Sequence, residues 1–98
     1  MQLKEDEQQA LRYLLGLWIK RCKYMQNRDR KFDWVEAAAL FRVQLVQVSL
    51  GNISEATRDS LVRGVTAERN DALKDEGVEG REALAANFNR LIEELQAL

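Results

Sequence analysis

The sequence predicts an all-α protein, and three observations lead to that prediction. The chain has 98 residues and no proline, so nothing bars long helices. Over most of the chain, apolar residues recur at alternating spacings of four and three, as one face of a helix requires. Polar or glycine-containing stretches separate these periodic segments. We therefore expect an antiparallel bundle of about four helices, over residues 4–28, 33–50, 53–75 and 81–98, within a single domain of residues 1–98.

The first predicted helix, residues 4–28, has one well-defined apolar face, which Leu14 widens. The face consists of Leu11, Leu15, Trp18, Cys22 and Met25. Acidic residues crowd the start of this helix and basic residues its end, as the helix dipole favours. The polar stretch 27–32 is the expected first turn.

The second predicted helix, residues 33–50, is apolar on two opposite faces. Asp33 is a suitable N-cap, and Gly51 is a suitable stop because glycine adopts the left-handed conformation freely. One face carries Trp34, Ala38, Phe41, Leu45 and Val48; the opposite face carries Val35, Ala39, Val43, Val46 and Leu50. Residues 43–50 also alternate as a strand does, but no second strand-like segment is present to pair with them.

A helix that is apolar all round must be covered all round. Two arrangements satisfy this requirement for residues 33–50. Either the helix lies centrally among the other three, or its second face is a subunit interface, with further copies of the chain or with another protein. We expect a homodimer or higher oligomer that uses this second face, Val35 to Leu50.

The last two predicted helices differ in how regularly their apolar residues are spaced: the third, residues 53–75, is the less regular, and the fourth, residues 81–98, is the more regular. Residues 53–75 carry a thin apolar stripe, with Asn52 or Ser54 as the cap, Glu55 completing a capping-box pattern, and a possible break at residues 70–71. The stripe consists of Ile53, Leu61, Val65 and Ala72. Residues 81–98 repeat the spacing of four and three with Leu84, Phe88, Leu91, Leu95 and Leu98.

The net charge of −1 conceals an uneven distribution. Residues 1–51 hold nine basic and six acidic side chains, whereas residues 52–98 hold six basic and ten acidic ones. Residues 20–31 alone hold six basic side chains and one acidic one. This region is either a peripheral packing edge with a solvated basic end or a binding surface. Because tyrosine and arginine are favoured at interface hot spots, we expect it to bind a protein partner. The predicted partner-binding residues are Tyr13, Leu17, Lys20, Arg21, Lys23, Tyr24, Arg28, Arg30 and Lys31.

The inventory of reactive groups disfavours catalysis. Histidine is absent, which removes the commonest general acid or base and the commonest metal ligand. The single Cys22 lies on the apolar face of its helix, and the five glycines lack the spacing of a phosphate-binding loop. We expect no enzyme activity, catalytic residue, metal, cofactor or small-molecule substrate. No segment has the pattern of a signal peptide or a membrane span, so we expect a cytoplasmic protein.

These features favour a small non-catalytic interaction protein, an adaptor, regulator or inhibitor, that acts through exposed helix surfaces and self-associates. This format is common among accessory proteins of bacteria and phages. One alternative is a nucleic-acid-binding helical module that uses residues 20–31. Another is a structural subunit of a larger assembly.

Overall fold

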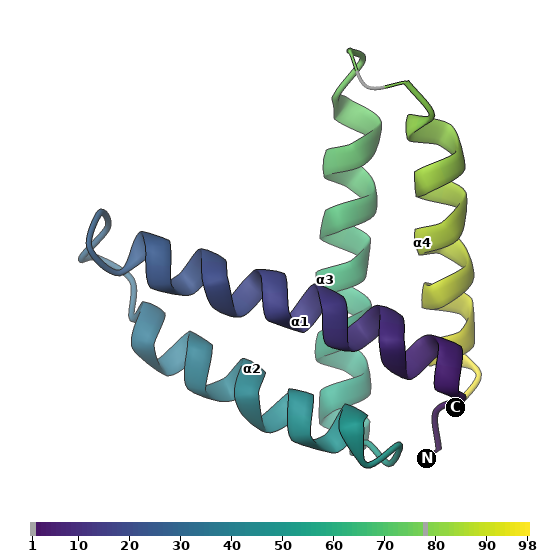
Figure 1. Ribbon diagram of the computed structural model, residues 1–98, viewed down its shortest axis with the longest axis horizontal. Helices are drawn as coiled ribbons and strands as arrows, with labels where there is room; N and C mark the ends of the chain where they lie inside the picture. Colours follow the sequence, from purple (N-terminus) through teal and green to yellow (C-terminus); the bar gives the residue numbers. More distant parts are fainter. Residues whose placement is uncertain (1, 78) are drawn as a thin grey trace. The chain divides into compact units, whose positions relative to one another are not determined.

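The computed structural model describes residues 2–77 and 79–98, and its regular elements are four α-helices (Figure 1). They are α1 (Glu5–Met25), α2 (Trp34–Ser49), α3 (Glu55–Lys74) and α4 (Arg81–Gln96). The predicted all-α, four-helix fold is confirmed. Residues 43–49 are helical, and α3 continues through residues 70–71 without a break.

Contacts divide the chain into two compact units, Met1–Ile53 and Ser54–Leu98. In the first unit α1 packs against α2, and in the second α3 packs against α4. Each pair is a helical hairpin in which the chain turns back on itself (Figure 1). The expectation of one domain stays a prediction.

The predicted apolar face of α1 is its buried face. Leu11 and Leu15 are fully buried, Trp18 and Cys22 are nearly so, and Met25 at the end of the helix is half-buried. The ring of Trp18 lies 5.6 Å, centroid to centroid, from that of Phe41 in α2. The helix ends at Met25 rather than at residue 28, because the polar residues that follow bring no apolar side chain to bury.

Both predicted boundary signals of α2 are present. The Asp33 carboxylate accepts a hydrogen bond of 2.9 Å from the Glu36 backbone N–H, which satisfies one free donor of the first turn. At the other end Gly51 has a φ of +73°. The Gly51 N–H donates to the Val48 carbonyl, and the Asn52 N–H donates to the Gln47 carbonyl. These two hydrogen bonds define a Schellman motif. These bonds end the helix at Ser49, with Leu50 as its C-cap.

The segment before α1 is hydrogen-bonded to the turn at Gly51. The Leu3 N–H donates a 2.8 Å hydrogen bond to the Gly51 carbonyl, and the Gln8 side-chain amide donates one of 3.0 Å to the Leu3 carbonyl. The Leu3 side chain is buried. The start of α1 and the end of α2 are therefore joined by backbone hydrogen bonds as well as by packing.

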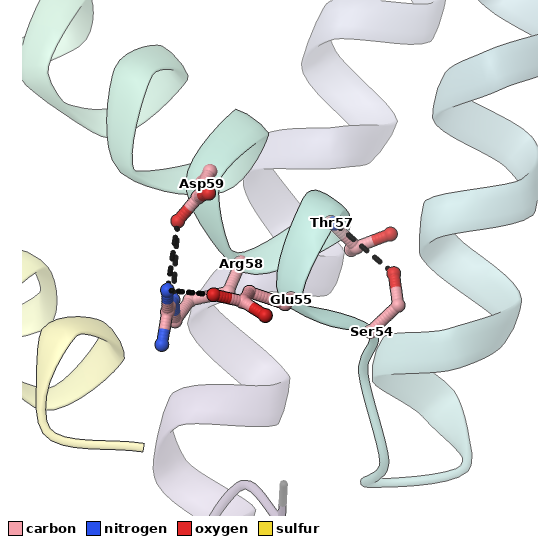
Figure 2. Close-up of polar contacts among 5 residues, drawn as sticks. All are labelled: Ser54, Glu55, Thr57, Arg58 and Asp59. Atoms are coloured by element: carbon pink, nitrogen blue, oxygen red, sulfur yellow. Dashed lines mark hydrogen bonds and ion pairs between the residues drawn. The ribbon is translucent and has the colours of Figure 1, made fainter.

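In the second unit, α3 begins at Ser54, whose hydroxyl accepts a 3.1 Å hydrogen bond from the Thr57 N–H (Figure 2). Ser54 is thus the cap, and the residue three positions after it is Thr57, so the expected capping box with Glu55 does not form. Glu55 instead lies near Arg58, which also pairs with Asp59 at 3.1 Å.

The buried face of α4 differs from the predicted one by one position at its start. Leu84 is exposed, whereas Ala85 is buried together with Leu91, Ile92 and Leu95. The helix carries adjacent apolar stripes, and burial of the stripe that contains Ala85 leaves Leu84 exposed. Across the same hairpin, the Arg69 guanidinium donates a 2.9 Å hydrogen bond to the Asn89 side-chain oxygen.

Candidate interaction surfaces

The second apolar face of α2 is exposed along its whole length. We call this surface the α2 outer face and define it by Val35, Ala39, Val43, Val46 and Leu50, the residues predicted as an oligomer interface. All five are exposed, and Leu50 is the most exposed of the four larger side chains, at 76%. Whether they form an interface stays a prediction, but the surface itself is present.

The opposite side of α2 explains why the outer face is open. Ala38, Gln44 and Val48 are buried, and Trp34, Phe41 and Leu45 are half-buried. Successive residues of a helix are about 100° apart, so these side chains occupy the side remote from Val43. Within its own unit α2 packs against α1 alone, and one neighbouring helix covers one side of a helix.

Two further apolar side chains, Phe32 and Leu40, extend the α2 outer face and were missed by the sequence analysis. They are 56% and 55% exposed. Phe32 precedes the helix and packs against Trp34, with ring centroids 4.6 Å apart. Its position three residues before Val35 continues the spacing of the face, which is a signal that the sequence does contain.

A hollow of about 520 Å³ lies at the N-terminal half of the α2 outer face. Its lining is mostly apolar and consists of Phe32, Asp33, Glu36, Ala37, Ala39, Leu40 and Val43. Ala37 and Ala39 contribute small side chains to this lining, and Phe32, Leu40 and Val43 contribute larger apolar ones. The hollow therefore suits an apolar side chain.

The α2 outer face, with Phe32 and Leu40, is large for an uncovered surface. From the exposed fractions of its side chains, it presents roughly 600 Å² of apolar surface, at the upper end of the largest patch on a typical monomer. Apolar patches of this size, next to charged residues such as Glu36 and Arg42, are typical of interaction sites.

The second predicted surface, which we call the basic edge, follows α1 into the turn after it. Tyr13, Leu17, Lys20 and Tyr24 lie at spacings of four, three and four and so form one exposed stripe. Tyr13 is 69% exposed and Tyr24 59%.

The predicted basic residues of this edge are all exposed, but they do not form a single cluster. Arg21 and Arg28 lie beside the tyrosine stripe, and the Arg28 guanidinium carbon is 4.2 Å from the centroid of the Tyr24 ring. Arg30 and Lys31 lie in the turn after α1, whereas Lys23 lies on the other flank of the helix. This arrangement presents several cations and an aromatic ring at one end of the hairpin.

The single cysteine of the chain, Cys22, is buried. Burial raises the pKa of the Cys22 thiol above its usual value, an effect that Arg21 and Arg42 partly oppose. Among residues 2–77 and 79–98, no group of three or more cysteine, aspartate or glutamate side chains is placed to hold a metal ion. In the same residues, no helix combines the length and the apolar character needed to cross a bilayer.

Comparisons of the chain with protein-family models, with curated proteins and with solved structures yielded no match. Function is therefore inferred from the α2 outer face and the basic edge.

Proposed function

We propose that this chain is a small, non-catalytic protein-interaction protein that self-associates through the α2 outer face. The observation that supports the proposal is the exposure of Val35, Val43, Val46 and Leu50 on a helix whose other side is buried. Exposed aliphatic side chains in one continuous row lower the free energy when a partner removes them from water.

The size of the surface is compatible with a stable dimer. Covering it in two copies removes roughly 1,200 Å² of apolar surface, the lower limit of a standard interface before any polar rim is added. An equal patch on each copy is what a two-fold symmetric interface requires. A cytoplasmic location is part of the proposal, because one cysteine cannot form the internal disulfides typical of small secreted domains.

Sedimentation equilibrium of the full chain, from about 1 to 100 μM, tests the proposal. We expect a concentration-dependent dimer. Val43→Glu places a charge at the centre of the α2 outer face, and we expect it to raise the dissociation constant at least tenfold. Leu84→Glu, at an exposed leucine of α4, is the matched control and should leave the dimer unchanged.

Circular dichroism of both variants should retain the helical signal, because both positions are exposed. A wild-type chain that is monomeric up to 100 μM contradicts the proposal. So does a dimer that Val43→Glu and Leu84→Glu affect equally.

A second candidate function, nucleic-acid binding, is favoured by the basic edge. Exposed cations contact phosphates, and an aromatic ring such as that of Tyr24 offers a stacking surface for a base. The test is anisotropy of a labelled single-stranded RNA, whose affinity should fall steeply between about 50 and 200 mM salt. The double variant Arg21→Glu/Arg28→Glu should abolish binding, and Arg90→Glu in α4 should not. If the wild-type protein does not bind the RNA even at the lower salt concentration, nucleic-acid binding is excluded.

A further inference from the structure

The two ends of the α2 outer face have different shapes. At the C-terminal end, Leu50 is the most exposed large apolar side chain in the described part of the molecule. At the N-terminal end lies the hollow of about 520 Å³, with Ala39 in its lining. A protruding side chain at one end and a hollow at the other complement a second copy that runs in the opposite direction.

Four of the five residues of the face are also placed symmetrically about its middle, and the fifth, Val43, lies beside the middle, opposite the second copy's residue 42. Val35 and Leu50 are equally far from the point between Arg42 and Val43, and Ala39 and Val46 are equally far from it as well. A two-fold axis at this point therefore places Val35 opposite the second copy's residue 50 and Ala39 opposite its residue 46. Isologous interfaces have this property, because each contact occurs twice.

Packing favours this orientation over a parallel one. In a parallel pair, Ala39 faces Ala39 of the second copy and Leu50 faces Leu50 of the second copy. The two small side chains leave a gap between the helices at one level, and the two large ones force the helices apart at another. In the antiparallel pair the small Ala39 faces a valine, so the combined size of the facing side chains varies less along the interface. Opposed helix dipoles also favour the antiparallel pair.

We infer that two copies pair through their α2 outer faces with the helices antiparallel, each Leu50 entering the hollow of the other copy. This inference rests on the self-association proposed above. Arg42 lies beside the two-fold axis, at the flank of the face, where its long side chain reaches water.

Cross-linking between single cysteines tests the orientation. The buried Cys22 is first replaced by serine, and a maleimide cross-linker with a span of about 8 Å, close to the distance between packed helices, joins the introduced cysteines. In an antiparallel pair the two copies of residue 50 are about 22 Å apart along the helix. Leu50→Cys should therefore not cross-link to itself, but it should cross-link to Val35→Cys when the two variants are mixed.

Val43→Cys, near the axis, should cross-link to itself and is the positive control. Self-cross-linking of Leu50→Cys without a product from the mixture overturns the antiparallel inference while leaving self-association intact. Sedimentation of the same variants separates the two claims, because a monomeric wild type contradicts both. As a second measurement, Leu50→Ala, at an exposed position that does not support the fold, should weaken the dimer at least about tenfold. An unchanged dissociation constant would contradict the placement of Leu50 in the hollow.

Discussion

The substitution Gly51→Ala tests how the end of α2, and with it Leu50, is held in place. Gly51 has a φ of +73°, which costs an L-residue with a side chain about 1–2 kcal/mol. An added Cβ would also lie 2.7 Å from the Gln8 side-chain nitrogen, closer than such atoms approach in proteins. Moving that amide breaks its bond to the Leu3 carbonyl, worth about 1 kcal/mol. We therefore expect a loss of about 2–3 kcal/mol in the free energy of unfolding.

Urea denaturation followed by circular dichroism, at one fixed protein concentration, measures this loss. In a Gln8→Ala background the same substitution should cost only the conformational share, about 1–2 kcal/mol. Equal costs in the two backgrounds would refute the proposed clash with Gln8.

Two other glycines are matched controls. Gly80 has a φ of +78°, and a Cβ there meets no atom within 4 Å in the described part of the chain. Gly80→Ala should therefore show the conformational cost alone. Gly16 lies within α1 in open space, so Gly16→Ala should stabilise the protein by about 0.5–1 kcal/mol. A destabilising Gly16→Ala would contradict the reasoning from added-Cβ contacts.

Two further predictions concern a helix cap and the buried thiol. Ser54→Ala removes the acceptor for the Thr57 N–H and should lower the free energy of unfolding by about 1 kcal/mol, whereas Ser54→Asp should remain close to wild type in the same assay. Because burial raises the pKa of the Cys22 thiol, the unfolded chain loses its thiol proton at lower pH than the folded chain does. The wild type should therefore lose stability relative to Cys22→Ala as the pH rises above about 9, and a constant difference from pH 7 to 10 would contradict this. At neutral pH a thiol reagent should label Cys22 slowly in the native protein and quickly in urea.

Several local features of the fold could be predicted because they depend on neighbouring residues. Asp33 caps α2 and Gly51 ends it, since a carboxylate and a residue without a side chain act over one helical turn. The buried face of α1 follows from the periodicity of its leucines and Trp18. The α2 outer face could also be identified as a set of residues, since a helix places every third or fourth side chain together.

The exposure of the α2 outer face could not be predicted from the sequence. Whether Val43 and Leu50 are covered depends on which helices pack against α2, and periodicity describes one helix at a time. The same reason explains the misplaced Leu84, because two adjacent stripes on α4 are equivalent until α3 packs against one of them.

The contacts between distant segments depend on tertiary structure as well. The hydrogen bond from the Leu3 N–H to the Gly51 carbonyl connects residues more than forty positions apart. Helix type, caps and apolar faces arise from interactions within a few residues, which the order of the amino acids specifies directly. Exposure and shape arise from packing between helices, and these two properties make the α2 outer face a candidate interface.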